Sequence, residues 1–391
     1  MPASLACASV TSPASWPVVG MVGGGQLARM THPAAIALGV RLAVLVASPD
    51  GSAAQVIPRP VVADEKALAD LMAFAAECDV VTFDHEHVPP EHIRAMEAAG
   101  VVVRPRSAAL LHAQDKGVMR ARLSAVGVPC PRHRAVADAG DVSAFAAEVG
   151  WPVVLKRIRG GYDGRGVWVA RSADDVTEPL RSGAPVLAEE LVDFRRELSA
   201  VVARSPSGQG VAYPVVESVQ RDGMCVEVVA PAPGLSADLA VEAQRIALTV
   251  AAQLDVEGVL AVELFETVDG RLLVNELAMR PHNSGHWGID GAVTSQFENH
   301  LRAVLDLPLG SPAARAPVTV MVNILGGDLP GAYSAYRHVL ARDPDLRVHW
   351  YGKSVRPGRK VGHVTVCGDD LDDLRDRARH AAAFLRGDID E

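Results

Sequence analysis

Two glutamates in a predicted β-hairpin are the first residues whose types and spacing could do chemistry. Asp269-Gly270 favours a two-residue hairpin turn between the apolar runs on either side of it. With that turn, Glu263 lies directly opposite Glu276, and side chains paired in this way have Cβ atoms about 4.5–5.5 Å apart. Two carboxylates at this distance repel each other, and one tends to stay protonated unless a cation lies between them. Mg²⁺ bound by these carboxylates and by nucleotide phosphates fits the pair, whereas two solvated carboxylates at the sheet edge are the alternative.

A glycine-rich loop is the second candidate. It runs from Lys156 to Gly166, and four of its last seven residues are glycine. Such a backbone can close over a polyanion, and Lys156, at the end of the preceding strand, can reach the phosphates. No Gly-Lys-Ser/Thr follows, so this is not a Walker A loop. A flexible hairpin turn without a ligand is the alternative.

Positive charge gathers again between residues 353 and 363, in a chain whose formal net charge is −9. Lys353, Arg356, Arg359 and Lys360 surround a Pro-Gly turn, which makes a compact anion site. Only five of the 38 basic residues are lysines, so each lysine is a candidate for a position that needs a compact ammonium group. A solvated turn is the alternative, since charged runs usually face water.

Glycines also fill the turn at residues 23–25, between an expected strand and an expected helix. The N–H groups at such a helix start could bind a phosphate. Ala28 stands where a GxGxxG motif needs its last glycine, so a tight structural turn is an equal alternative.

Two histidine pairs could bind a transition metal. His282 and His286 are four residues apart, and His85 and His87 flank Glu86. No cysteine or HExxH frame supports a metal at either place, so we interpret them as hydrogen-bonding residues.

The elements that must position these residues follow from the hydrophobic pattern. Residues 18–46 predict a β-α-β unit, and the strands after it predict a parallel sheet with helices on its faces. Residues 127–131 are expected to be a linker. The expected strands cover residues 18–22, 41–46, 80–83, 101–103, 152–156, 167–169, 185–190, 211–217, 258–265, 271–276, 318–325 and 361–367. The expected helices cover residues 26–38, 67–77, 91–98, 142–149, 237–254 and 371–385.

Length and composition limit the class of protein. The chain has 391 residues, of which 49% are apolar, which predicts two or three domains. Its acidity argues against a general nucleic-acid binder, and no apolar run reaches the ~20 residues that a membrane-spanning helix needs. The five scattered cysteines form no CxxC pair, which predicts a reducing, cytoplasmic setting.

Several of these pieces resemble the ATP-grasp superfamily and, within it, the 5-(carboxyamino)imidazole ribonucleotide synthases. GGYDGRG, HNSGHW and RPGRKxGH are highly specific for the latter, whereas NEL is shared by the wider superfamily. Lys116 departs from the arginine that the family often has, and the N-terminal extension has no counterpart. The other matching stretches are GGGQLARM, TFDHEHVP, QDKGVMRARL, EELVDFRRELS and SQFENHLRA.

The resemblance implies an ATP-grasp fold of α/β and α+β domains that begins with a parallel-sheet, pre-ATP-grasp domain. The segments it implies are a disordered extension at 1–17, an N-terminal domain at 18–137, a small lid domain at 138–198 and a large C-terminal domain at 199–391. ATP would lie between the last two.

The resemblance also implies roles for individual residues. The basic segment at 353–363 and the glycine turn at 23–25 add further candidates for binding the acceptor. Glu263 and Glu276 would bind magnesium. The expected catalytic residues are Tyr162, Asp163, Arg165, His282, Lys353 and Arg356. The expected ATP contacts are Lys116, Lys156, Gly161, Tyr162, Asp163, Gly164, Arg165, Gly166, Val167, Glu189, Glu190, Leu191, Val192, Glu197, Glu217, Asn275 and Glu276. The expected contacts to the acceptor and bicarbonate are Gly25, Gln26, Leu27, Glu86, Arg280, His282, Asn283, Lys353, Arg356, Arg359 and Lys360.

The implied activity is carboxylation of the amine of 5-aminoimidazole ribonucleotide, with ATP, Mg²⁺ and bicarbonate, through carboxyphosphate, in purine biosynthesis. ADP and phosphate are released. The implied protein is a cytoplasmic homodimer whose partners are small molecules, not nucleic acid or membrane. The alternatives are another ATP-grasp carboxylase, a formate-using transferase and a non-catalytic nucleotide-binding regulator. The intact pair of Glu263 and Glu276 argues against the regulator.

Overall fold

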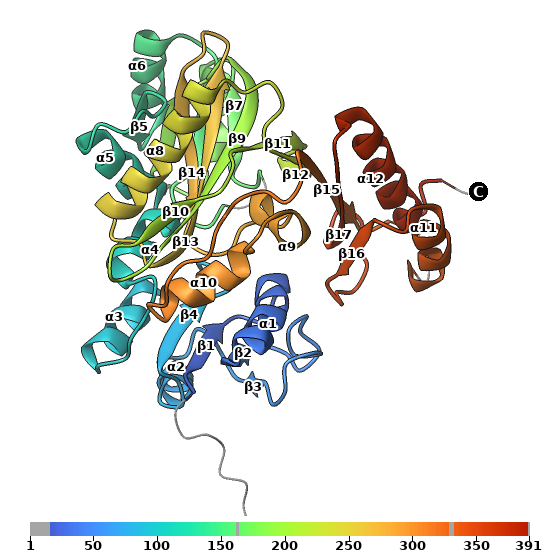
Figure 1. Ribbon diagram of the computed structural model, residues 1–391. Helices are drawn as coiled ribbons and strands as arrows, with labels where there is room; N and C mark the ends of the chain where they lie inside the picture. Colours follow the sequence, from blue (N-terminus) through green and yellow to red (C-terminus); the bar gives the residue numbers. More distant parts are fainter. Residues whose placement is uncertain (1–15, 162–163, 328–331, 390–391) are drawn as a thin grey trace, which may run out of the picture.

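The computed structural model describes residues 16–161, 164–327 and 332–389 (Figure 1). Three sheets organise the chain. We name the parts around them the N-terminal unit (β1–β4 with α1–α3), the lid unit (β5–β8 with α6) and the large unit (β9–β17). The expected domain boundaries at residues 137 and 198 stay a prediction, and so does the tail, most of which lies outside the described residues.

The N-terminal unit contains a parallel sheet in the order β3-β2-β1-β4. Its strands are β1 (Val18–Val22), β2 (Arg41–Val46), β3 (Val61–Val62) and β4 (Val80–Phe83). Its helices are α1 (Gln26–Leu38), α2 (Leu68–Ala75) and α3 (Pro90–Ala98). The predicted parallel sheet is confirmed. The strand predicted at 101–103 is reduced to one bridge between Val81 and Val103, and Pro105, which lacks an N–H, follows shortly after.

The lid unit contains an antiparallel sheet in the order β5-β8-β6-β7. Its elements are β5 (His133–Val136), α6 (Ala139–Val149), β6 (Val153–Arg157), β7 (Val167–Ala170), α7 (Thr177–Leu180) and β8 (Val186–Glu190). The glycine-rich loop joins β6 to β7, and Lys156 pairs with Val167 in that hairpin. Tyr162 and Asp163 lie outside the described residues.

The large unit contains a nine-stranded sheet in which every pairing is antiparallel. Its strands are β9 (Phe194–Arg204), β10 (Gly210–Ala212), β11 (Val216–Arg221), β12 (Met224–Ala230), β13 (Gly258–Thr267), β14 (Leu272–Ala278), β15 (Val318–Leu325), β16 (Arg347–Trp350) and β17 (Lys360–Gly368). Its helices are α8 (Ala237–Gln253), α9 (Gly288–Gly291), α10 (Gln296–Val304), α11 (Tyr336–Arg342) and α12 (Leu371–Arg386). The single strand predicted at 211–217 is wrong, because Pro214 separates β10 from β11.

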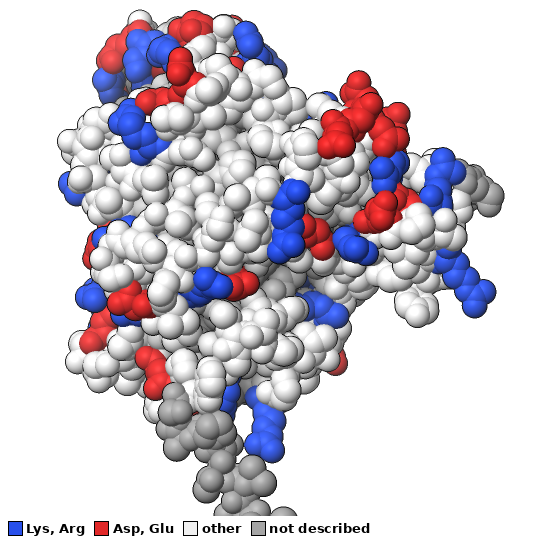
Figure 2. Space-filling view, in the orientation of Figure 1, with Lys and Arg blue, Asp and Glu red and all other residues white. Residues whose placement is uncertain are grey.

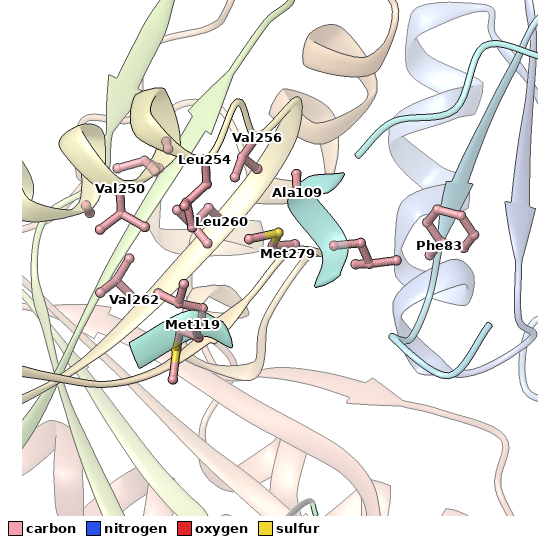
Figure 3. Close-up of a cluster of buried hydrophobic side chains, with 14 of the residues drawn as sticks. Phe83, Ala109, Met119, Val250, Leu254, Val256, Leu260, Val262 and Met279 are labelled. Carbon is pink, nitrogen blue, oxygen red and sulfur yellow. The ribbon is translucent and has the colours of Figure 1, made fainter. Parts of the chain in front are cut away.

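One hydrophobic core joins the N-terminal unit to the large unit. Figure 3 shows Phe83 of β4, Ala109 of α4 (Ser107–Gln114) and Met119 of α5 (Lys116–Ala125) in the same cluster as Leu260 and Met279. The lid unit has its own smaller core around Phe145 and Leu155. The two larger parts are therefore packed as one body, with the lid sheet attached to them.

The surface carries no long stretch of one charge on the face that Figure 2 shows, where acidic and basic side chains are scattered among uncharged ones. Within the described residues, no helix is long and apolar enough to cross a membrane. The last strands and α11 and α12 form a separate lobe at the right of Figure 1.

Candidate active site

A cavity of about 970 Å³ lies where the three units meet. Gln26 and Glu86 of the N-terminal unit, Lys156 of the lid unit and Glu263 and Lys353 of the large unit all line it. Most residues predicted for the site share this cavity. The predicted residues that line it are Gln26, Leu27, Glu86, Lys116, Lys156, Gly161, Gly164, Val167, Glu189, Glu190, Leu191, Val192, Glu197, Glu263, Asn275, Glu276, Arg280, His282, Asn283, Lys353 and Lys360.

The hairpin of β13 and β14 pairs Glu263 with Glu276, as predicted, but by a different route. The turn has three residues, not two, because Thr267 N–H bonds to Arg271 O at 2.9 Å. This shifts the register by one residue. An irregularity after Glu263 shifts it back, so that Asn275 is an extra residue on β14. Such a bulge re-aims side chains, and here both Asn275 and Glu276 line the cavity.

The two glutamates make the electrostatic environment that the sequence predicts. Burial, followed by the negative charges of Glu276 and Glu197, raises the pKa of Glu263 to about 8. Lys116 Nζ lies 2.5 Å from Glu276 Oε1 and offsets part of its charge. His282 Nε2 lies 3.4 Å from Glu263 Oε1. Within the described residues, no three His, Cys, Asp or Glu side chains come together to hold a metal, so a cation between these carboxylates needs ligand oxygens as well.

A buried ion-pair network fixes Lys156. Glu189 Oε2 accepts from Lys156 Nζ at 2.7 Å, and Glu189 Oε1 accepts from Arg120 Nε at 2.6 Å. Burial alone would raise the pKa of Glu189, but Arg120 and Lys156 outweigh it and hold the pKa at about 2. Lys156 also donates to Asn275 Oδ1 at 2.9 Å. The Glu189 carboxylate is thus committed to these cations, so a nucleotide contact at this position falls to its backbone.

Arg120 is a residue of this network that sequence reasoning missed. It is fully buried and also donates to Val274 O at 2.9 Å and to Asn275 O at 2.7 Å. The guanidinium therefore ties α5, β8 and the bulge of β14 together. The sequence of α5 gave little signal for it, because Lys116 and Arg122 make Arg120 one of three basic residues in the same helix.

Glu197 of β9 lines the cavity and forms no ion pair with another described residue. Burial raises its pKa to about 7, and Lys156 only partly opposes that rise. The neighbouring Leu191 and Phe194 supply apolar surface at the same end of the cavity. Glu190 pairs with Arg132 at 2.8 Å.

Of the predicted site residues that the structure describes, six do not line the cavity. Glu217 is bound by Arg196 and Arg375, at 2.9 and 3.3 Å. Arg356 is exposed, and Arg359 donates to Ser354 Oγ at 2.6 Å, so of the basic segment only Lys353 and Lys360 reach the cavity. The remaining three are Gly25, Arg165 and Gly166.

In the glycine turn at 23–25, a side chain of the protein takes the place that a phosphate was predicted to fill. Gly25 N–H donates to Asp84 Oδ2 at the start of α1. Asp84 is buried, and burial raises its pKa. A phosphate at this helix start would meet a carboxylate, so the tight-turn alternative fits better. Asp84 was missed, although its place directly after β4, at the carboxyl edge of the parallel sheet, was a signal.

Three basic residues, Arg280, Lys353 and Lys360, line the part of the cavity that we call the basic end. Arg280 Nε lies 2.7 Å from Glu86 Oε2, and Lys353 bonds to Gln26 Oε1. Lys353 also lies over the Tyr351 ring at 5.9 Å. Burial, then the charges of Arg280 and Lys360, lower the pKa of His282 to about 3, so that this histidine is neutral.

Comparison with known proteins gives three family matches along the chain. The ribonucleotide synthetase pre-ATP-grasp domain matches residues 17–114, and the ATP-grasp domain matches residues 121–297. The phosphoribosylaminoimidazole carboxylase C-terminal domain matches residues 319–377.

The chain is 60% identical to N5-carboxyaminoimidazole ribonucleotide synthase of Mycobacterium tuberculosis over 94% of this chain and 88% of the relative. It is 47% identical to the enzyme of that name from Corynebacterium ammoniagenes, over 94% and 92% of the two chains. The structure of the Aspergillus clavatus synthase in complex with ADP and 5-aminoimidazole ribonucleotide is similar, with a TM-score of 0.87, 32% identity and coverage of 96% and 99%. The Thermus thermophilus synthetase matches with a TM-score of 0.86, 38% identity and coverage of 95% and 99%.

Proposed function

Because the chain belongs to the N5-carboxyaminoimidazole ribonucleotide synthases, we propose how its own residues carry out the reaction of that family. The protein is an ATP-dependent ligase of purine biosynthesis that carboxylates the amine of 5-aminoimidazole ribonucleotide. The observation that carries the residue roles is one cavity that is lined both by Lys156 and Glu189 of the lid unit and by the basic residues Arg280, Lys353 and Lys360.

ATP occupies the end bounded by the lid unit. Lys116 and Lys156 lie where they can contact its phosphates, and Glu189 with Asn275 holds the Lys156 ammonium in place. Glu197 accepts a hydrogen bond from the ribose. The apolar surface of Leu191 and Phe194 lies against the adenine.

Mg²⁺ is bound by Glu263 and Glu276. The fit is supported by their all-oxygen donor set and by the raised pKa of Glu263, since a carboxylate pair that repels itself when ionised is stabilised by a divalent cation. When bound, Mg²⁺ offsets negative charge on the phosphoryl group that is transferred.

The acceptor ribonucleotide and bicarbonate occupy the basic end. Lys353 and Lys360 offer ammonium groups to an anionic group, and Arg280, held by Glu86, offers a guanidinium. Tyr162, Asp163 and Arg165 of the lid loop remain proposed contacts to the acceptor.

The reaction has two steps. A bicarbonate oxygen attacks the γ-phosphorus of ATP, which gives carboxyphosphate and ADP. The acceptor amine nitrogen then bonds to the carboxyl carbon, phosphate leaves with the bonding electron pair, and the amine gives up one proton. The chain positions the two anions and screens their charges, which is most of what phosphoryl transfer asks of a protein.

ADP release, measured with and without 5-aminoimidazole ribonucleotide and bicarbonate, tests this function. We expect release to need Mg²⁺ and bicarbonate and to rise with the acceptor. A nucleotide-binding regulator would bind ATP without acceptor-dependent release, and another carboxylase would respond to a different acceptor.

We also propose a division into three domains, which the three sheets support. From the family resemblance we propose a homodimer in the cytoplasm that binds neither nucleic acid nor membrane. Static light scattering of the full chain tests the dimer.

A further inference from the structure

His286 is a cavity residue to which the proposed function gives no role. It follows the short turn Asn283–Gly285 after β14, is 0% exposed, and is one of the residues that line the cavity. Its Nε2 atom has no hydrogen-bond partner among the described residues. A buried polar atom without a partner is costly, so a ligand or a water is expected there.

The hydrogen on the His286 ring can be assigned from its neighbour Gln296. Gln296 Oε1 accepts from His282 N–H at 2.9 Å, and Gln296 Nε2 donates to His282 O at 2.7 Å. These two backbone contacts fix which end of the amide is nitrogen. The second N–H of Gln296 then donates to His286 Nδ1 at 3.1 Å. Nδ1 is an acceptor, so in the neutral ring the hydrogen lies on Nε2.

Burial, then the nearby His282 and Lys360, lower the pKa of His286 well below its usual value, which keeps the ring neutral. The unpartnered atom is therefore an N–H donor and not a lone pair. This excludes a metal at Nε2 in this tautomer, because a metal needs the lone pair there.

His282 shows the same arrangement on the neighbouring turn. Its Nδ1 accepts from Ser284 N–H at 3.3 Å and lies 2.8 Å from Ser284 Oγ, which leaves the hydrogen on Nε2. The Nε2 atom of His282 lies 3.4 Å from Glu263 Oε1, whereas that of His286 has no partner among the described residues. Both histidines line a cavity that Arg280 and Lys360 also line. An unpartnered N–H donor near two cations favours a small oxyanion as the group that it binds.

Two neighbouring aromatic rings also hold the ring of His286 in place. It stacks on His363 with centroids 5.2 Å apart and on Phe297 with centroids 5.7 Å apart. A fixed ring gives its N–H a fixed direction, which is what recognition of a planar carboxyl group needs.

We propose that His286 is a second histidine donor for the carboxyl group, and that its Nε2–H donates a hydrogen bond to an oxygen of bicarbonate and of the carboxyphosphate formed from it. This rests on the proposed function, which places bicarbonate at this end of the cavity. His282 lies on the side of Glu263, whereas His286 lies on the side of His363.

The test is a steady-state comparison of three variants of the full chain. His286→Leu should raise the KM for bicarbonate about tenfold, which corresponds to ~1.4 kcal/mol, while the KM for ATP changes less than about twofold. His286→Gln should restore most of the loss, because a glutamine amide can place an N–H near the position of Nε2. His349→Leu is the matched control, since His349 stacks on His363 and not on His286 and does not line the cavity in the described residues, and its bicarbonate KM should stay near that of the wild type.

Equal loss in His286→Leu and His349→Leu, or a parallel rise in both KM values with a lower melting temperature, would show a packing role and overturn the proposal. Should the leucine variant fail to fold, nitrogen-15 spectra of the histidine-labelled wild type decide. The His286 Nε2–H signal should move when bicarbonate is added to the ADP-bound protein, and an unmoved signal or a hydrogen on Nδ1 contradicts the inference. A wild type without bicarbonate-dependent ADP release would contradict the proposed function itself, which is a separate outcome.

Discussion

Arg120 shows how much of the proposed nucleotide site depends on a residue that does not line the cavity. Its guanidinium satisfies one oxygen of Glu189 and two backbone carbonyls of β14, and Glu189 in turn holds Lys156. One buried guanidinium thus fixes both Lys156, through Glu189, and the bulge of β14. Removing such a group destabilises the folded state, because its partners stay buried without a hydrogen-bond partner or water.

Arg120→Met should therefore lower the free energy of unfolding by ~3–5 kcal/mol, the usual cost of removing one partner of a buried ion pair. It should also raise the KM for ATP, since Glu189 and Asn275, which hold Lys156, would lose their own contacts with Arg120. Denaturant unfolding and steady-state kinetics measure both, with Arg132→Met, which removes an exposed pair with Glu190, as the matched control. A stability loss below ~1 kcal/mol would show that the network is not needed.

Glu197 gives a pH dependence with a definite sign. Its pKa is about 7 in the folded chain and near 4.5 when unfolded, so between these values the folded state keeps a proton that the unfolded state has lost. This contribution to stability is complete below about pH 4.5 and is lost as the pH rises through about 7. The melting temperature of Glu197→Gln should fall less over that window than that of the wild type. Parallel curves for the two proteins would contradict the raised pKa.

At the scale of elements, local pattern predicts most strands and helices, and the failures have physical causes. The helix at 26–38 and the strands at 18–22, 41–46, 80–83 and 318–325 have the predicted bounds. The strands are largely apolar runs ended by glycine or polar residues, and the helix ends at Gly39. β9 was missed, since its first half carries charged residues that reach the cavity and other strands. The glutamate pairing is correct only because a longer turn and a bulge compensate, and no local pattern encodes both.

The segment 351–353 shows one element positioned by another nearly 300 residues away. Gln55 Nε2 donates to Gly352 O at 2.7 Å, and Ser52 Oγ donates to Tyr351 O at 2.5 Å. A Cβ on Gly352 would clash with Gln55 Oε1, and the φ of +66° at Gly352 also favours glycine. These contacts place Lys353 at the cavity, which sequence spacing alone could not predict.

Gln55→Ala should therefore raise the KM for the acceptor several-fold and leave the KM for ATP unchanged, because Lys353 loses its support while the lid end is untouched. Gln209→Ala is the control, since Gln209 Oε1 also holds a loop backbone, that of Leu309, in another part of the chain. Acceptor and ATP titrations of ADP release measure the effect. An equal rise in both KM values would mean that Gln55 supports the whole fold and not this segment.

At the scale of the molecule, the site is built where a rigid body meets a smaller sheet. The N-terminal and large units share a core, and Thr82 and His300 join them by a 2.9 Å hydrogen bond. The lid unit has its own core and reaches the rest of the site through Lys156 and Glu189, whose partners lie on α5 and β14. Composition predicts several domains, but it does not predict which of them share a core, because that depends on contacts between residues far apart in sequence.

This arrangement predicts the order in which the chain opens. In native-state hydrogen exchange, amides of β6 and β7 should exchange before those of β4 and β13, because a small core with few long-range contacts opens at lower free energy than the shared one. β4 and β13 should exchange together, although about 180 residues separate them. ATP with Mg²⁺ should slow exchange in β6 and β8 most, since ligand contacts there add to the ion pairs of Lys156 and Glu189. Simultaneous exchange of all three units, with or without nucleotide, would mean that the lid does not open separately.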